Sequence, residues 1–300
     1  MQPTCIVIVG PTAVGKTALA IRVAEQFQTS VISADSRQCF REMSIGVAKP
    51  STEELARVHH YFINSHSIQQ EVNAAVFEQY ALQSVNQIFA HRPVAVMTGG
   101  TGLYVKAFCE GLDDIPPVSL EVREQISRQY EQQGLSWLQQ QVAQLDPVYY
   151  STGEIHNPQR LIRALEVKMA TGQSIRTYQQ GNKATRPFKI VKIGLDLPRP
   201  LLYENINRRV EIMMAQGLQE EVRSLLPWKH LNALQTVGYN ELFDYFGGQK
   251  SLPEAVEAIK TNTRHYAKRQ LTWFKKDVET QWFSPNNEQD VQEFCAAATR

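Results

Sequence analysis

The feature that most constrains this 300-residue chain is a glycine-rich loop directly after an apolar segment. Residues 5–9 are continuously apolar and rich in β-branched side chains, which is typical of a strand covered on both faces of a parallel sheet. The loop matches GxxxxGK followed by Thr, with the residues Gly10, Pro11, Thr12, Ala13, Val14, Gly15, Lys16 and Thr17. Residues 17–27 then show apolar side chains at helical spacing. The order strand, loop, helix predicts a phosphate-binding loop in an α/β fold.

The chemistry of this loop follows from its residue types. Its glycines allow consecutive backbone N–H groups to point at one anion, and the helix that follows contributes the positive end of its dipole. Lys16 supplies a point charge, and the Thr17 hydroxyl can ligate Mg²⁺. Three reactions fit such a loop: phosphoryl transfer from ATP to a small molecule, nucleotide-gated switching, and departure of a whole diphosphate from an alkyl group.

Further apolar segments extend the α/β pattern. Strands are expected at 31–33, 94–97 and 189–195, and helices at 72–90, 201–226 and 253–276. Between about 118 and 176 the sequence has helical spacing and no convincing strand. We therefore predict an α/β fold: a P-loop NTPase-like parallel sheet flanked by helices, formed by residues 1–112 and 187–300, with an all-helical domain inserted at 113–186.

Composition narrows the class of protein but not its ligand. Lys and Arg total 31 against 30 for Asp and Glu, so bulk charge neither favours nor excludes nucleic acid. The four cysteines are widely spaced, which predicts reduced thiols and no zinc site. No stretch approaches the ~18 apolar residues of a membrane span. We expect a soluble, cytoplasmic protein without membrane contact and, by default, a monomer.

Polar residues follow two of the expected strands. Asp35 comes after the second strand, and Thr101 lies in a Gly-Gly-Thr-Gly turn after the third. The carboxyl ends of parallel strands border the ligand crevice, so both residues are expected to face it. From the residues alone, Asp35 is equally consistent with a turn cap and with a catalytic carboxylate.

Seven segments in order resemble the tRNA dimethylallyltransferases, also called tRNA isopentenyltransferases, in their bacterial form. The segments are GPTAVGKT, SADSRQ, GVAKP, GGTGLY, PQRLIRALEV, VGY and KRQLTWF, and they extend from Gly10 to Phe274. The resemblance implies transfer of the dimethylallyl group from dimethylallyl diphosphate to N6 of adenosine 37, in tRNAs that read codons beginning with U. It also implies Mg²⁺ as cofactor and the tRNA anticodon stem-loop as partner. Two positions depart from the family pattern: Val47 replaces Thr, and Phe40 replaces Tyr.

The resemblance also implies roles for individual residues. Lys16 and Mg²⁺ on Thr17 would stabilise charge on the leaving diphosphate, and Asp35 would act as general base. Thr101 would contact the tRNA near the reacting atoms. Arg209 best matches a family arginine that binds diphosphate, with Arg208 beside it as the rival. The positions that match tRNA-contacting ones are Asp35, Ser36, Arg37, Gln38, Thr101, Arg123, Gln159, Arg160, Leu161, Ile162, Arg163, Gly238, Tyr239, Lys268, Arg269 and Gln270.

One further segment is unusually basic. Residues 260–276 contain no acid, and their cations are Lys260, Arg264, Lys268, Arg269, Lys275 and Lys276. This pattern predicts a phosphate-binding stripe, the alternative being a solvated helix face with an aromatic core side. Three other functions remain open: a P-loop small-molecule or nucleotide kinase, prenyl transfer to free adenine nucleotides, and a non-catalytic RNA-binding module that uses a nucleotide as a switch.

Overall fold

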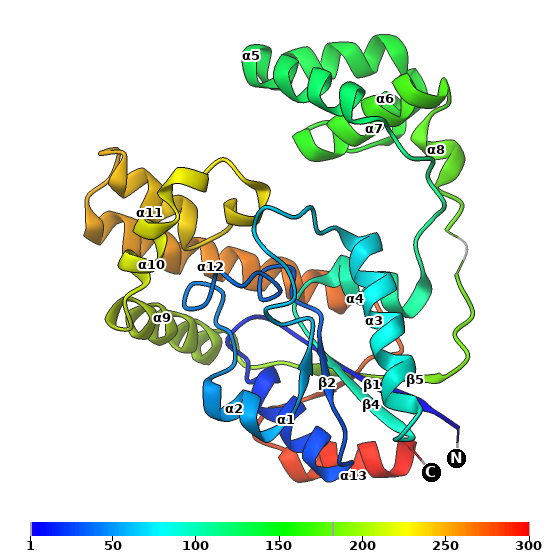
Figure 1. Ribbon diagram of the computed structural model, residues 1–300, viewed down its shortest axis with the longest axis vertical. Coiled ribbons are helices and arrows are strands. Elements are labelled where there is room, and N and C mark those ends of the chain that lie inside the picture. Colours follow the sequence, from blue (N-terminus) through cyan, green and yellow to red (C-terminus); the bar gives the residue numbers. More distant parts are fainter. Residues whose placement is uncertain (1, 182, 300) are drawn as a thin grey trace. The chain divides into compact units, whose positions relative to one another are not determined.

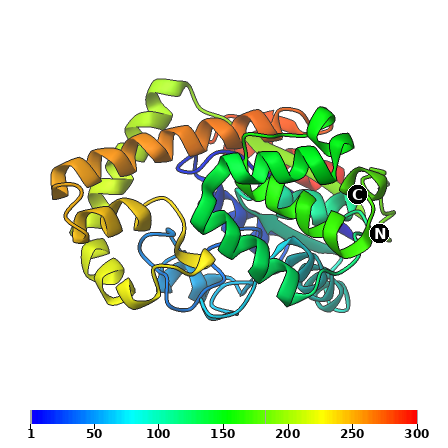
Figure 2. The ribbon, with the colours of Figure 1, turned by 90° about the horizontal axis from the view of Figure 1, so that it is seen from above.

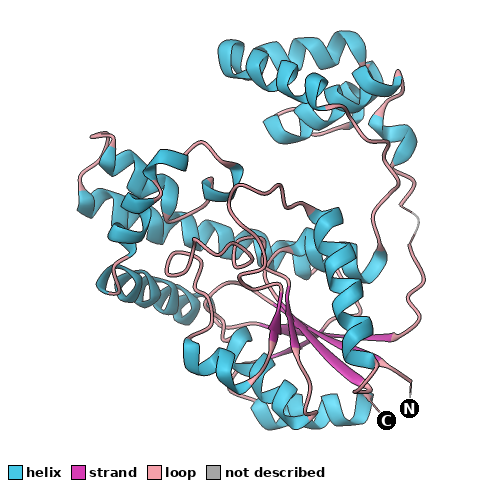
Figure 3. Cartoon of the chain, viewed as in Figure 1, coloured by secondary structure: helices cyan, strands magenta, loops and turns pink. Residues whose placement is uncertain are grey.

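The computed structural model describes residues 2–181 and 183–299 and contains one parallel β-sheet. Its strand order is β3-β2-β4-β1-β5-β6, and each neighbouring pair is parallel. The strands are β1 (Thr4–Val9), β2 (Val31–Ser33), β3 (His60–Tyr61), β4 (Val94–Thr98), β5 (Lys189–Leu195) and β6 (Gln281–Phe283). The predicted parallel sheet is confirmed, and two short edge strands, β3 and β6, were not predicted (Figure 3).

Alternating residues of β1 belong to two hydrophobic cores. Ile6 and Ile8 pack with residues of α1 and α13, whereas Cys5 and Val7 pack with residues of α3 and α4. These helices are α1 (Lys16–Gln26), α13 (Glu288–Ala298), α3 (Ala74–Phe89) and α4 (Gly102–Glu110), and Figure 1 shows the two pairs on opposite faces of the sheet. A strand buried on both faces explains why this segment has no polar residue between Cys5 and Val9.

A second group of helices packs beside the carboxyl ends of the strands. It consists of α2 (Thr52–Arg57), α9 (Arg199–Ala215), α10 (Leu218–Ser224), α11 (Tyr239–Phe246) and α12 (Leu252–Phe274), with short 3-10 turns at Leu226–Trp228 and Asn232–Leu234. The helix predicted at 201–226 is divided because Gly217 has a φ of +97°, which ends α9 and begins α10. The helix predicted at 253–276 is α12, one long unbroken helix in Figure 2.

The chain forms two compact units, Met1–Cys109 with Thr185–Arg300, and Glu110–Ala184. The sequence placed these boundaries at 113 and 186. The described residues of the second unit contain no strand, and its helices are α5 (Leu120–Leu145), α6 (Pro147–Thr152), α7 (Pro158–Thr171) and α8 (Ile175–Tyr178). They enclose their own core around Leu138, Val142 and Leu165. The α5 helix bends at Gly134, whose φ is +72°.

The cysteines and the helices bear on two expectations from composition. All four cysteines are buried as free thiols. Within residues 2–181 and 183–299, no helix combines the length and apolar character needed to cross a membrane.

Candidate active site

The phosphate-binding loop lies between β1 and α1, at the carboxyl end of the central strand. Gly15 precedes the first turn of α1 with a φ of +101°, which favours glycine. The amine of Lys16 turns back over the loop, and its Nζ donates to the carbonyl of Pro11 over 2.7 Å. Desolvation, with a smaller contribution from Arg209, lowers the pKa of Lys16 to about 7, against an opposing effect of Asp35.

This loop borders a cavity of about 250 Å³ that gathers residues from distant parts of the chain. Its walls come from the loop itself, from the turns after β2 and β4, and from helices α9 and α12. Four of the five residues with a predicted role in the chemistry line it together, namely Lys16, Thr17, Asp35 and Arg209, and the fifth, Thr101, is not in the lining. With Glu54, the cavity therefore combines two basic side chains and two carboxylates at the edge of the sheet where ligands of parallel α/β proteins bind.

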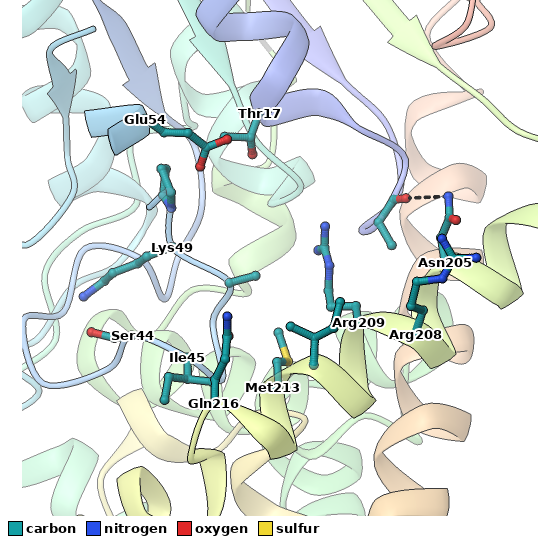
Figure 4. Close-up of a pocket in the computed structure, with 14 residues that line it drawn as sticks. Thr17, Ser44, Ile45, Lys49, Glu54, Asn205, Arg208, Arg209, Met213 and Gln216 are labelled. Carbon is teal, nitrogen blue, oxygen red and sulfur yellow. Dashed lines mark hydrogen bonds between the residues drawn. The ribbon is translucent and has the colours of Figure 1, made fainter. Parts of the chain in front are cut away.

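Of the two candidate arginines, Arg209 is the one at the loop. Its Nη1 donates to the Thr12 hydroxyl over 3.1 Å, and desolvation lowers its pKa. Arg208 instead pairs with Glu204 at 2.8 Å, one helical turn earlier on an exposed face. Figure 4 shows both arginines beside a neighbouring cavity of about 430 Å³, which Arg209 and Thr17 also line. Geometry thus favours Arg209 as the anion-binding residue.

Asp35 is both a turn cap and a cavity residue. Its Oδ1 accepts hydrogen bonds from the backbone N–H groups of Arg37 at 2.8 Å and Gln38 at 3.2 Å. The side chain also lines the 250 Å³ cavity and a second cavity of about 410 Å³. Thr12, Arg209 and Tyr266 line both cavities as well. The two interpretations that the sequence left open are compatible, since the cap fixes the carboxylate where the cavities meet.

The 410 Å³ cavity has the more apolar lining. Its hydrophobic side chains come from four separate segments, and they are Val47, Val210, Met213, Val237 and Ile259. Its polar lining includes Arg37 and Arg269. A cavity of this composition accepts an apolar group or a flat ring, while its charged side chains orient a polar edge.

Thr101 connects the turn after β4 to the segment that holds Asp35. Its Oγ1 accepts the backbone N–H of Ser36 at 3.0 Å, and its hydroxyl also bonds the phenol of Tyr266. Desolvation raises the pKa of Tyr266 to about 12, so the phenol is protonated at neutral pH. No sequence motif assigned a role to Tyr266, which belongs to the basic segment 260–276. It lies four residues before Gln270 on α12, and this helical spacing could have placed both residues at the cavity.

Gln270 joins two loops of the site. Its Oε1 accepts the Thr12 N–H at 2.8 Å, and its Nε2 donates to the Gly100 carbonyl at 2.9 Å. A β carbon at Gly100 would overlap this Nε2, which explains glycine at that position. The side chain is 6% exposed and both ends of its amide are used inside the protein. Gln270 therefore braces the wall of the 250 Å³ cavity that it also lines, and its tRNA contact stays a prediction.

The loop around Gly46 is fixed by a residue that the sequence did not single out. The carboxylate of Glu221 on α10 accepts the N–H groups of Ser44 at 3.0 Å, Ile45 at 2.8 Å and Gly46 at 3.0 Å. It also accepts the Tyr239 hydroxyl at 2.6 Å. This loop contributes lining to all three cavities. Four hydrogen bonds to one carboxylate make Glu221 the main anchor of the loop.

The other residues predicted to contact tRNA fall into a buried group and an exposed group. Leu161 lies in the core of the second unit and Tyr239 in the core of the first, and each is 0% exposed. Both side chains have packing roles, and their matched tRNA contacts stay predictions. Gly238 is also buried, and its N–H donates to Glu241. The partly or fully exposed ones are Ser36, Arg37, Gln38, Arg123, Gln159, Arg160, Ile162, Arg163, Lys268 and Arg269.

The basic segment is not a uniform stripe. Lys260 forms ion pairs with Glu211 and Glu257, and Lys275 pairs with Asp196 at 2.6 Å. Arg264 donates to Asn207 and Thr261, each at 2.9 Å. Half of the six cations thus have internal partners, and the others are Lys268, Arg269 and Lys276. The stripe therefore stays a prediction for Lys268, Arg269 and Lys276, because acids pair with Lys260 and Lys275, and the polar side chains of Asn207 and Thr261 engage Arg264.

The oxygen donors at the loop fit a hard cation. Thr17, Asp35 and Glu54 line the 250 Å³ cavity, and Figure 4 shows the Thr17 and Glu54 side chains pointing toward one another. Among the residues that the structure describes, no three His, Cys, Asp or Glu side chains form a metal-binding group. Mg²⁺ does not require one, since it keeps several waters and is bound through one or two carboxylates and substrate phosphates.

Comparison with known proteins places this geometry in context. Residues 38–277 match the family model described as IPP transferase. The chain is 47% identical over 293 residues to tRNA dimethylallyltransferase 1 of Bacteroides thetaiotaomicron, covering 98% of this chain and 95% of the relative. It is 50% identical over 283 residues to the tRNA dimethylallyltransferase of Christiangramia forsetii, covering 94% of each.

Solved structures agree with the sequence relatives. The crystal structure of tRNA isopentenylpyrophosphate transferase from Bacillus halodurans has 33% identity and a TM-score of 0.73, with 99% of this chain and 97% of that one covered. A eukaryotic dimethylallyltransferase acting on tRNA has a TM-score of 0.76 at 23% identity, over 99% of this chain and 78% of that one. The second likeness supports the fold.

Proposed function

The chain belongs to the IPP transferase family, and from this premise we propose that it transfers the dimethylallyl group of dimethylallyl diphosphate to tRNA. The observation that carries the proposal is the position of Asp35. It lines both the cavity of the phosphate-binding loop and the adjoining apolar cavity. A carboxylate between an anion site and an apolar space suits the transfer of an apolar group from a diphosphate to a nucleophile that must lose a proton.

The phosphate-binding loop would hold the leaving group. When the allylic carbon–oxygen bond breaks, its electron pair stays with the diphosphate and negative charge grows there. Lys16, Arg209 and the N–H groups at the start of α1 are the donors available to that charge. We propose that Thr17 holds Mg²⁺, with Asp35 and Glu54 as the nearby carboxylates. Bound there, the ion would neutralise part of the charge on the diphosphate.

Asp35 would prepare the nucleophile. The exocyclic nitrogen N6 of adenosine forms the new bond to carbon and must release a proton, which the Asp35 carboxylate accepts as general base. The cap from the Arg37 and Gln38 amides occupies Oδ1 and holds the carboxyl group in place. We propose adenosine 37 of tRNAs that read codons beginning with U as the acceptor, extruded from the anticodon loop into the 410 Å³ cavity.

The neighbours of the proposed base support the same assignment. Tyr266 lines both cavities and bonds Thr101, whose hydroxyl bonds the N–H of Ser36. The protonated phenol is therefore a hydrogen-bond donor beside Asp35, suited to a ring nitrogen or a phosphate oxygen. In the second unit, we propose that Arg123 and the exposed residues of 159–163 contact the tRNA away from the reacting base.

A single assay distinguishes this proposal from its alternatives. The protein is incubated with Mg²⁺ and dimethylallyl diphosphate labelled in the isoprenoid, together with tRNA, with AMP, or with ATP and a panel of small acceptors. We expect label in tRNA, and N6-isopentenyladenosine after nuclease digestion. Label in AMP alone would indicate prenylation of free nucleotides, and phosphate transfer from ATP without prenylation would indicate a kinase. The Lys16→Met variant, which lacks the ammonium group, is the matched control.

A further inference from the structure

One exposed face of α12 carries cations around an aromatic ring. Its side chains line a shallow cavity of about 400 Å³, and they are His265, Lys268, Arg269, Thr272, Trp273 and Lys276. Successive members are three or one residue apart, which places the five that belong to α12 on one face of the helix, and Lys276 lies in the turn just after its end. The lining includes no carboxylate. The face is thus suited to an anionic partner that also has an aromatic or apolar part.

The lysines of this face differ from the other lysines of the basic segment 260–276. Lys260 and Lys275, which lie elsewhere on the same segment, are paired with acids of neighbouring segments. Within the described part of the chain, neither Lys268 nor Lys276 forms an ion pair. Both are exposed. Their charges are therefore available to an external phosphate.

Trp273 is exposed and yet held in place. Its side chain is 41% exposed, and a β carbon at Gly102 would overlap its indole ring. Gly102 begins α4 immediately after Thr101. Glycine at this position therefore lets the ring pack against the turn that borders the proposed active site. An aromatic ring fixed beside cations is the usual platform on which unpaired bases stack.

The cationic face continues from the proposed adenosine cavity. Arg269 lines both the 410 Å³ cavity, together with Asp35 and Tyr266, and the cavity beside Trp273. Its guanidinium lies 5.7 Å from the centroid of the Tyr266 ring. A strand with one base in the first cavity would therefore pass Arg269 and reach Trp273 with its next nucleotide.

We propose that Trp273 is the stacking platform for the unpaired nucleotide adjacent to the reacting adenosine, and that Lys268 and Lys276 bind the phosphates on either side of it. This inference rests on the proposed function, because the tRNA anticodon loop supplies the single strand. It adds a binding subsite outside the catalytic cavities. An acidic protein segment is the competing occupant, which the following experiment excludes or reveals.

A thermodynamic cycle tests the stacking contact. Dissociation constants are measured for an anticodon stem-loop RNA and for the same RNA with an abasic site beside the target adenosine, using wild-type protein and Trp273→Ala. We expect Trp273→Ala to weaken binding of the intact loop about tenfold and to leave binding of the abasic loop almost unchanged. Trp228→Ala is the matched control, since Trp228 is 38% exposed and lines none of the cavities described above.

A second measurement does not depend on how the alanine variant folds. The nucleotide beside the target adenosine is replaced by the fluorescent base 2-aminopurine, and we expect its emission to be quenched on binding to wild-type protein and to Trp273→Phe. An unquenched base, or an equal loss of affinity for intact and abasic loops, would overturn the subsite and make the face a structural or protein-binding surface. Prenylation of tRNA by the wild-type protein is measured in parallel, so that failure of the subsite is distinguished from failure of the proposed function.

Discussion

The side-chain amide of Gln270 donates a hydrogen bond to the carbonyl of Gly100 over 2.9 Å. Its oxygen accepts the N–H of Thr12 at the same time. A residue of α12 thereby ties the phosphate-binding loop after β1 to the turn after β4, which lie next to one another in the sheet. Gln270 thus fixes the separation of the two loops that border the proposed diphosphate site.

Replacing Gln270 with alanine is expected to lower the free energy of unfolding by about 1–3 kcal/mol, because two buried backbone groups lose their partners. Urea denaturation measures the loss. The matched variant is Thr272→Ala, two residues away on the exposed side of α12, which should stay within about 0.5 kcal/mol of wild type. Equal stability of Gln270→Ala and wild type would mean that the bridge contributes nothing to folding.

Glu221→Gln is expected to loosen the loop around Gly46. The amide retains one acceptor oxygen and directs its NH₂ toward groups that are themselves donors, and hydrogen bonds to a charged group are worth about 1.5–3 kcal/mol each. We predict lower stability and weaker binding of dimethylallyl diphosphate, measured by urea denaturation and calorimetry. Tyr239→Phe removes only the phenol bond, so its effect should be the smaller of the two. The reverse order would contradict the assignment of Glu221 as the anchor.

The lowered pKa of Lys16 predicts proton uptake when diphosphate binds. At about pH 8 the amine, with a pKa of about 7, is mostly neutral, and a bound anion raises that pKa so that a proton is taken up. Calorimetric titration with dimethylallyl diphosphate in two buffers of different ionisation enthalpy should show the uptake for wild type and not for Lys16→Met. Below about pH 6 the amine is already charged and the difference should vanish. If the binding enthalpies of wild type and Lys16→Met depend on the buffer in the same way at pH 8, Lys16 does not take up the proton.

The lowered pKa of Lys16 also determines how this residue affects folding stability at different pH values. Its pKa is about 7 in the folded protein against the 10.5 of a free lysine, so the unfolded chain binds more protons between these limits. The contribution of Lys16 to stability therefore increases as pH rises from about 7 to about 10.5. Comparison of wild type with Lys16→Met by denaturation at both ends of this window measures the change. The free energy of unfolding of Lys16→Met should exceed that of wild type by the largest margin at the lower pH.

Affinity for tRNA should fall steeply with added salt, because Lys and Arg contacts displace counterions from the RNA. We predict that Lys276→Gln reduces the slope of log affinity against log salt by about one unit or slightly less. Lys275→Gln is the matched control on the next residue, since Lys275 is engaged by Asp196. The slope is measured by filter binding at several salt concentrations. Equal slopes for the two variants would show that the surface around Trp273 and Lys276 does not contact the tRNA.

Local sequence patterns were sufficient to predict the central strands and the phosphate-binding loop. The β1 and β5 segments have apolar patterns that extend over five to seven residues, and the loop pattern lies directly between strand and helix. The edge strands β3 and β6 were missed because two or three residues carry no periodicity and, unlike β2 with Val31 and Ile32, neither contains a β-branched residue. The helix predicted at 201–226 ran through Gly217, because apolar spacing alone does not show that this glycine adopts a positive φ and ends α9.

Pairing between distant segments could not be predicted in the same way. The basic segment was counted as six cations because its partners Glu211 and Asp196 lie far away in the sequence. Glu221 has no motif of its own, and only the fold brings it to the N–H groups of the loop at Gly46. Tyr239 belongs to a motif of the family, yet its hydroxyl is used internally. A matched motif therefore identifies a residue that matters without saying whether it touches the ligand.

The most direct test of the central claim is a single-turnover measurement with Asp35→Asn. Asparagine keeps an oxygen that can cap the Arg37 and Gln38 amides but cannot accept the proton of N6. With protein in excess over tRNA and saturating dimethylallyl diphosphate, we predict a rate of prenylation at least about a hundredfold below wild type, with tRNA affinity unchanged within about twofold. Transfer at the wild-type rate would show that Asp35 is not the general base and would contradict the proposed mechanism.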